Sequence, residues 1–571
     1  MRRPLPGTAV LTLTAGLTAA LLAAPAALAA PDPLGRTPVK GPAGKSVALT
    51  ALGSYVSDVF DASAAEIVAH DPLTQRLFVV NAASGTVDVL DGRDPTSMTL
   101  LRTLDTAGLQ AADGSVIGNG AVVNSVAVRD GLLAIAVQAQ DKVQPGWTAF
   151  FGTEGDLPYV SAVRVGALPD MVTFSPDGRT VLVANEGEPA KDFATDPEGS
   201  VSLVDVSGGA TALTQQDVRT ATFRAWDQGR ALPAGVRVFG PDVAVPAGQA
   251  PAGRVARNLE PEYITVGHDS TTAYVALQEA NTIAVLDLAT AQFTDLLPLG
   301  SQDWSAPGNE HDASDRDGAV ALRSWPVRAL LLPDAIASYR FRGQTFLVTA
   351  NEGDAREWGD YADVTRLGSA AYRLCADVFP DAASLKQPAN LGRLNVSLED
   401  GRRPGADCFE TVHVLGSRSF SVFTTEGERV FDSGGEIERL IAGGAGGVPS
   451  SGFNSNHTSN SSFDARSDDK GPEPEGVTLG RVAGRTYAFI GLERTGGVLT
   501  YDVTDPRAVT FVDYANNRGW QAPVPSRAAG DLGTEGVTFV PADQSPTGGP
   551  LLLTANEVSG TTTAFAVERR R

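Results

Sequence analysis

The chain has little cysteine, little histidine and few basic side chains, and each shortage excludes a class of protein. Its 571 residues include two cysteines and five histidines, so neither a four-thiolate zinc site nor a four-cysteine iron–sulfur cluster can form. A site of two thiolates and two imidazoles is disfavoured because the two cysteines are far apart. With 45 Lys and Arg against 67 Asp and Glu, the formal net charge is −22. This charge argues against binding nucleic acid through phosphate contacts.

Familiar catalytic motifs are missing as well. The sequence has no Gly-x-Ser-x-Gly, no His-Glu-x-x-His and no phosphate-binding glycine loop followed by Lys-Ser/Thr. His311, His413 and His457 are scattered, and we expect them to be surface or turn residues rather than general bases. A serine triad is therefore disfavoured. Any hydrolysis would have to use cation-activated water, with Arg356 and Arg494 as electrostatic clamps on an anion.

The composition that remains is that of a globular protein rich in turns. Hydrophobic residues make up 42% of the chain and charged residues 20%, which excludes a disordered or fibrous protein. The 61 glycines and 36 prolines favour many turns and short strands over long helices.

The N-terminus has the pattern of an export signal. Arg2 and Arg3 precede an apolar stretch over 9–22, and Ala27-x-Ala29 forms a small-residue cleavage site, so we predict a signal peptide over 1–29 with cleavage near Ala29. A membrane anchor is the alternative, but the stretch is short and ends in small residues. Because no second apolar segment of membrane length follows, we expect a mature protein without a transmembrane segment that is secreted, periplasmic or associated with the cell envelope.

That compartment permits a disulfide bond. Cys375 and Cys408 enclose a loop of 33 residues, and cross-linking it could contribute about 3–4 kcal/mol by loop-entropy reasoning. We predict this pairing, with two free thiols as the alternative.

The strongest internal signal is a repeated unit of short strands. A copy opens with an acid and apolar residues, as in Pro169–Phe174, passes through a turn such as Ser175–Gly178, and continues in an apolar strand such as Val181–Ala184 that ends near a second acid. Clear copies open at 169, 261, 333, 474 and 534, and weaker ones at 66 and 124.

Seven such copies predict an all-β fold, a seven-bladed β-propeller with long insertions. A single blade cannot bury both of its faces, so blades stack around an axis; a pair of β-sandwiches is the alternative. Seven blades of about 45 residues use roughly 315 residues, which leaves many for insertions. We expect a linker over 30–50 and a propeller domain over 51–567, with insertions near 207–258, 299–330, 355–410 and 432–472.

The repeat also predicts where acids gather. The first strand of each propeller blade lines the central channel, so the acids that open the copies should surround one mouth, and the acids after the second strands should lie near a common face. Crowded carboxylates repel one another unless a cation neutralises them, and hard oxygen ligands suit calcium or magnesium; we favour calcium. The alternative is that these acids bond backbone amides or cap turns. The candidate ligands are Asp170, Glu186, Glu262, Glu279, Asp334, Glu352, Asp354, Glu475, Glu493, Glu535 and Glu557.

Three insertions carry further acids. The segment 351–361 mixes carboxylates, an amide and an arginine within eleven residues. Asp312–Gly318 has some of the alternation of a calcium loop but lacks the full twelve-residue pattern. The segment 466–476 leads directly into a copy of the repeat, so we expect it over the same acidic face, with a salt-bridged loop as the alternative.

Several of these stretches resemble the choice-of-anchor I family. They are 260–264, 312–318, 349–356, 466–477 and 555–562, and the resemblance spans about residues 50–567. It implies a seven-bladed propeller of the YVTN kind outside the cytoplasm, in a family similar to an animal cell-surface glycoprotein and to phytase-like or alkaline phosphatase-like propellers. Members use different C-terminal surface anchors, and this chain shows none, which favours free secretion or periplasmic residence.

Two functions remain open at this point. The first is a non-enzymatic module whose acidic face holds a divalent cation and binds a small ligand or a cell-envelope component. The second is a metal-dependent phosphoesterase that acts on extracellular phosphate esters. A quinone-dependent redox role is a distant third, because no vicinal cysteine pair or tryptophan set supports it.

Overall fold

The computed structural model describes residues 46–242 and 253–570, where most regular structure is β-strand. Seven four-stranded antiparallel sheets follow one another along these residues. The first four sheets are β2–β5 (Val68–Asp71, Arg76–Asn81, Thr86–Asp91, Thr99–Asp105), β6–β9 (Val122–Arg129, Leu132–Gln138, Pro145–Gly152, Tyr159–Ala167), β10–β13 (Pro169–Phe174, Thr180–Asn185, Ser200–Asp205, Val218–Thr222) and β14–β17 (Ile264–Val266, Thr272–Leu277, Thr282–Asp287, Gln292–Pro298).

Of the other three sheets, the fifth is interrupted by an insertion between its second and third strands, and the seventh takes its outer strand from the N-terminal side of the chain. They are β20, β21, β27 and β28 (Ile336–Phe341, Gln344–Asn351, Ser419–Thr424, Arg429–Asp432), β29–β32 (Pro474–Val482, Arg485–Leu492, Val498–Asp502, Thr510–Ala515) and β33–β35 with β1 (Thr534–Val540, Leu551–Asn556, Thr561–Arg569, Val47–Val56). Strand β1 pairs antiparallel with β35 from Val47 opposite Arg569 to Val56 opposite Thr561, so backbone hydrogen bonds join residues from opposite ends of the sequence.

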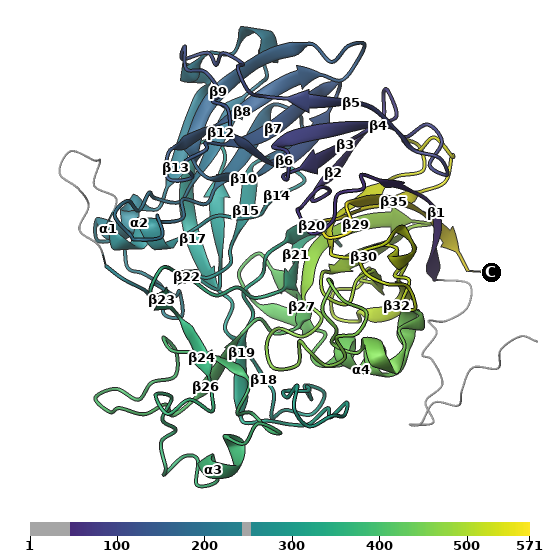
Figure 1. The fold of residues 1–571 in the computed structure, drawn as a ribbon. Helices are drawn as coiled ribbons and strands as arrows, with labels where there is room; N and C mark the ends of the chain where they lie inside the picture. Colours follow the sequence, from purple (N-terminus) through teal and green to yellow (C-terminus); the bar gives the residue numbers. More distant parts are fainter. Residues whose placement is uncertain (1–45, 243–252, 571) are drawn as a thin grey trace, which may run out of the picture. The chain divides into compact units, whose positions relative to one another are not determined.

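Figure 1 shows the sheets coloured in chain order. Apolar clusters join each sheet to the next. The last of these clusters packs Leu551 and Leu553 of the seventh sheet against Val68 and Leu77 of the first. The first strands also contact one another in cyclic order: β2, β6, β10, β14, β20, β29, β33 and back to β2. Because each sheet buries both faces against neighbours in a cycle, the fold is a β-propeller, and the predicted all-β class is confirmed.

The insertions around the fifth sheet form a small substructure with its own apolar core, which includes Trp304, Tyr372 and Phe409. Its elements are β18 (Ser301–Asp303), β19 (Val327–Leu330), β22 (Glu357–Trp358), β23 (Tyr361–Ala362), β24 (Val364–Arg366), α3 (Ala382–Leu385), β25 (Asn395–Ser397) and β26 (Val412–Leu415).

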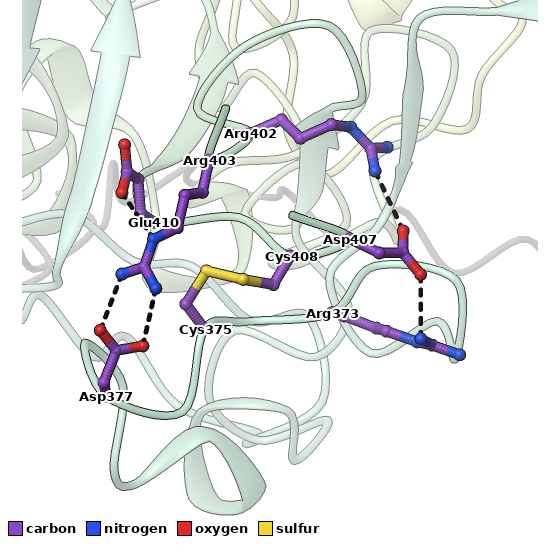
Figure 2. Close-up of a disulfide and its surroundings, with 8 residues drawn as sticks. All are labelled: Arg373, Cys375, Asp377, Arg402, Arg403, Asp407, Cys408 and Glu410. Atoms are coloured by element: carbon purple, nitrogen blue, oxygen red, sulfur yellow. Dashed lines mark hydrogen bonds and ion pairs between the residues drawn. A yellow bond between two sulfur atoms is a disulfide. The ribbon is translucent and has the colours of Figure 1, made fainter. Parts of the chain in front are cut away.

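A disulfide between Cys375 and Cys408 closes part of this substructure, as predicted (Figure 2). Beside it, Arg403 donates hydrogen bonds to both carboxylate oxygens of Asp377 and to Glu410. The disulfide and these ion pairs hold together a segment that has little regular secondary structure.

The remaining helical turns are short. They are α1 (Arg224–Asp227), α2 (Arg254–Asn258), α4 (Glu436–Ala442) and the 3-10 turns Ala210–Ala212, Gln215–Asp217, Ala445–Gly447, Ser450–Gly452 and Arg527–Ala529. Within 46–242 and 253–570 no helix has the length and apolar character needed to cross a membrane. The signal peptide predicted over 1–29 lies outside the described residues.

Candidate cation site in an acidic cavity

In several sheets the strand pairing is irregular at the acid that opens the repeat. The pairing of β10 with β11 shifts register between Pro169 and Met171, so Asp170 has no partner residue across the sheet. The same shift leaves Glu475 and Glu535 unpaired in β29 and β33. A bulge of this kind redirects the side chain of the extra residue.

Glycine follows the acid in two of these strands because the neighbouring backbone is very close. A Cβ on Gly476 would stand 2.0 Å from the carbonyl oxygen of Glu535, and one on Gly536 would stand 2.2 Å from that of Glu66. No side chain fits at either position. The pairs Glu475-Gly476 and Glu535-Gly536 therefore mark places where the starts of adjacent sheets touch.

These strands surround a cavity of about 380 Å³ whose charged lining residues are all acidic. They are Glu66, Asp170, Glu186, Glu188, Asp334 and Glu535, and Tyr263 lines the cavity as well. Burial, and then the negative charge of neighbouring carboxylates, raises the pKa of Asp170 to about 7 and raises the pKa of Glu262, Asp334, Glu475 and Glu535 well above the ordinary range. The five acids that open the clear repeats therefore lie close enough to repel one another.

The acids that follow the second strands join the same region. Glu186, Glu352, Glu493 and Glu557 come directly after β11, β21, β30 and β34, and Glu279 follows β15. Each contributes a carboxylate oxygen to at least one group of three potential ligand atoms that lie within 4.8 Å of one another. Asp354, by contrast, has a half-exposed side chain and lies 3.7 Å from the ammonium of Lys470.

On one side of this region the protein supplies its own cations. Lys470 forms an ion pair with Glu352 and lies 3.5 Å from Glu473. Arg494 contacts Glu473 and Glu493, each at 2.8 Å. These cations, together with Arg466, hold the pKa of Glu473 far below its usual range although burial opposes this. The segment 466–476 therefore lies against the acids and forms a salt-bridged loop.

A second group of acids forms no ion pair with the described residues. Carboxylate oxygens of Glu186, Glu262 and Glu279 lie within 4.8 Å of one another, and among the described residues none of the three forms an ion pair. Glu279 is 3% exposed, and its Oε2 atom, like that of Glu262, has no hydrogen-bond partner in the described part of the chain. Burial raises the pKa of Glu279 to about 7 although Arg356 lies nearby. We call these three residues the glutamate triad.

The two arginines proposed from the sequence as anion clamps are already engaged. Arg356 is buried, pairs with Glu260, and donates to the side-chain and backbone oxygens of Asn258 at 2.7 and 3.0 Å. Arg494 is held by Glu473 and Glu493, and it also contacts His457. These contacts do not support a clamp function, which stays a prediction.

Glu66 was not among the predicted ligands, and Lys470 and Glu473 were expected near the acids only as part of the segment 466–476. Glu66 opens the first weak repeat, lines the cavity, and groups with Glu535 and Glu557; burial raises its pKa to about 8. Its position in the repeat was the signal that could have identified it. Lys470 and Glu473 carry no repeat signal.

The expectation that the histidines are surface or turn residues was wrong for His311, whereas His457 does lie in a turn, although its side chain is buried. His311 is fully buried and lies 3.1 Å from Gln302 and 3.3 Å from Glu438. His457 is 8% exposed and lies 3.0 Å from Glu493. Both contact carboxylates contributed by other parts of the chain, which the local sequence does not indicate.

The acids of the loop over 312–318 are used within the protein. Asp312 accepts hydrogen bonds from the backbone of Ser314 and Ala321, and Asp315 pairs with Arg393 at 3.0 Å. The loop therefore offers its carboxylates to protein donors.

Comparison with known families and proteins gives one extended match and two named relatives. The family described as Choice-of-anchor I domain matches residues 66–506. Gigasin-3a of Magallana gigas is 31% identical over 192 residues, which cover 32% of this chain and 67% of that protein. The Mesenchyme-specific cell surface glycoprotein of Strongylocentrotus purpuratus is 26% identical over 280 residues, 43% of this chain. The matched part spans about a third, 35%, of that glycoprotein's length.

Solved structures with similar strand arrangements are distant. Kuenenia stuttgartiensis hydrazine synthase gives a TM-score of 0.42 at 12% identity, covering 90% of this chain and 99% of that one. A streptogramin B lyase gives 0.41 at 8% identity, covering 92% and 100%. No conclusion rests on similarities at this level.

Proposed function

This chain belongs to the choice-of-anchor I family, and we propose that it acts outside the cytoplasmic membrane as a β-propeller recognition module in which the glutamate triad beside the acidic cavity binds a divalent cation, calcium by preference. The formed disulfide supports this location, because disulfides persist in oxidising compartments. The relative described as a cell surface glycoprotein supports it too.

The observation that carries the cation proposal is the glutamate triad. Three carboxylates that meet with no ion pair repel one another and lose hydration energy on burial. Either they hold protons at neutral pH or a cation neutralises them. The carboxylate oxygens of the triad lie within 4.8 Å of one another, close enough to ligate one ion. Calcium accepts oxygen ligands in a flexible shell, whereas magnesium requires shorter distances and a more regular one.

A cation bound here would leave positions for a ligand. Calcium takes about six to eight oxygens, and the triad offers one from each of three residues. Oxygen atoms of a bound molecule in the neighbouring cavity of about 380 Å³ could complete the shell. This arrangement favours recognition of an oxygen-rich ligand through the ion. The phosphoesterase hypothesis has no comparable support, because its two arginines are engaged by carboxylates.

Metal binding by the full chain tests this proposal. Protein stripped with chelator is dialysed against calcium or magnesium, and bound metal is measured by elemental analysis and by titration calorimetry. We expect calcium to bind at the triad and the variants Glu262→Gln and Glu279→Gln to weaken it at least tenfold. Glu428→Gln, which removes an exposed carboxylate, is the matched control and should leave binding unchanged.

Three results would count against the proposal. A wild-type protein that holds no divalent ion and gives no calorimetric signal would refute it, as would triad variants that bind calcium as the wild type does. Chelator-sensitive turnover of a chromogenic phosphate ester would instead establish the phosphoesterase hypothesis.

A further inference from the structure

Several carboxylates that line the acidic cavity of about 380 Å³ have no partner in the protein. Among the described residues, the side chains of Asp170, Glu186, Asp334 and Glu535 form no ion pair and accept no hydrogen bond. Glu186 also belongs to the glutamate triad, in which the Oε2 atom of Glu279, a residue that is 3% exposed, has no partner either. The cavity therefore adjoins the proposed calcium site through Glu186.

Glu188, which also lines the cavity, pairs with an ammonium group of the protein. Its partner is Lys142, which lies in the loop between β7 and β8 with its Nζ atom 6.0 Å from the ring centre of Trp358. In the described part of the chain no lysine or arginine lines the cavity itself. One lining acid thus already binds an ammonium group, and the unpartnered ones attract further positive charge.

The second sheet contributes amides to the cavity where other sheets contribute acids. The pairing of β6 with β7 shifts register at Asn124, as the pairing of β10 with β11 does at Asp170. Asn124 Nδ2 donates to Gln138 Oε1 and to the backbone oxygen of Pro169, both at 3.1 Å. Within 46–242 and 253–570 this leaves the amide oxygen of Asn124 and the amide nitrogen of Gln138 without a partner, and both residues line the cavity. This side of the cavity can therefore both donate to and accept from hydroxyl groups.

We propose that this cavity binds a sugar unit that carries a free amino group, with its ammonium among the unpartnered carboxylates and its hydroxyls on the amides of the second sheet. The inference rests on the proposed function, because further hydroxyls of the sugar would complete the shell of the calcium ion at the triad. Apolar lining residues such as Ile67, Leu168 and Val537 suit the apolar face of a pyranose ring. The acids would repel an anionic sugar or a phosphate ester. The volume lies within the range of about 300–1,000 Å³ that is common for small-molecule sites.

Titration of the full chain with D-glucosamine at pH 7, followed by ligand-observed NMR and calorimetry, tests this inference. N-acetyl-D-glucosamine is the matched control ligand, because acetylation removes the charge of the amine and keeps the ring hydroxyls, and D-glucuronate is the anionic control. With calcium present we expect glucosamine to bind at least about tenfold more tightly than either control, because hydrogen bonds between charged groups are stronger than neutral ones. With chelator the affinity should fall, but the preference for glucosamine should persist.

The variant Asp334→Asn removes one unpartnered carboxylate and keeps the size of the side chain. It should weaken glucosamine binding severalfold and leave the binding of N-acetylglucosamine unchanged, because only the amine contact is lost. Glu428→Gln, which removes an exposed carboxylate, is the matched control and should bind both sugars as the wild type does. If Asp334→Asn does not fold, as judged by circular dichroism, Glu535→Gln replaces it with the same expectation.

The outcomes separate this inference from the calcium site. A protein that binds calcium but holds glucosamine no more tightly than N-acetylglucosamine overturns the inference and leaves the calcium site standing. A protein that binds no calcium but keeps the preference for glucosamine refutes the calcium site and supports the amine contact. Tighter binding of glucuronate, or unchanged glucosamine affinity in the folded carboxylate variant, would also overturn the inference.

Discussion

A buried ion pair between Arg418 and Glu438 makes the replacement Glu438→Gln the most informative test of how the insertions are fixed. Both side chains are fully buried, and Arg418 Nη1 lies 2.6 Å from Glu438 Oε1. The same guanidinium donates to the backbone oxygens of Asp312, Ser467 and Asp469. One charge pair therefore connects α4, the insertion before β20, and the loop that carries Lys470 to the acidic region.

The expected loss follows from the burial of the arginine. The positive charges of Arg418 and its surroundings lower the pKa of Glu438 to about 2 although burial opposes this, so the pair is ionised at neutral pH. Removing one partner leaves an uncompensated buried charge, which costs about 3–5 kcal/mol. At about 2.1 cal/mol/K per residue, a chain of 571 residues that unfolds as one unit loses about 3–4 °C in Tm.

Differential scanning calorimetry at pH 7 with chelator present measures this loss. Glu428→Gln is the control, because it removes the same charge from an exposed position and should change stability by less than about 0.5 kcal/mol. A second readout is limited proteolysis, which should cut the segment 456–471 faster in Glu438→Gln than in the control.

If Glu438→Gln and Glu428→Gln melt at the same temperature and are cleaved at the same rate, the buried pair does not hold the insertions in place.

Three further predictions concern calcium, pH and the disulfide. At a calcium concentration of 100 times Kd the free energy of unfolding should rise by about 2.7 kcal/mol, which corresponds to about 2 °C in Tm. A fluorescence melt of Glu279→Gln should show less than half of this rise in Tm. An equal rise in the variant would exclude the triad as the calcium site. Burial raises the pKa of Asp464 to about 8, so the folded protein keeps a proton there that the unfolded chain releases, and stability from this group falls as pH rises from about 4 to 8. The Tm advantage of Asp464→Asn over the wild type should therefore grow between pH 5 and 8 and then level, and a constant difference would show that Asp464 does not titrate in this window. Replacing Cys375 and Cys408 by serine opens a loop of 33 residues and should lower the free energy of unfolding by about 3–4 kcal/mol. The loss should be seen first as faster proteolysis between residues 355 and 410. Unchanged cleavage would show that the apolar core alone holds the segment.

The acids that open the repeats show how much of the candidate site can be predicted from the sequence. Asp170, Glu262 and Asp334 recur at one phase of a repeated strand pattern, and that phase alone predicts that they meet. The structure brings them together, as their mutually raised pKa values indicate. Glu66 and Asn124 stand at the same phase in weaker copies, so a stricter use of the same rule would have placed Glu66 at the cavity.

The ion-pair partners of the buried charged residues could not be predicted from the repeat. Lys470 and Glu352 are separated by 118 positions along the chain. Arg418 directly precedes β27, whereas Glu438 lies in α4. Local patterns record which residues alternate and repeat, but they do not record how an insertion folds back over its neighbours.

The repeated β-strands, the all-β class and the gathering of acids could be predicted from the sequence because they follow from short-range periodicity, and the cysteine pairing could be predicted because the chain has two cysteines. The sequence does not show which of those acids pair with Lys470 and Arg494 and which, in the glutamate triad, form no ion pair with the described residues. An ion pair requires two charged atoms within about 4 Å of each other, and that separation is set by how distant loops pack on the sheets.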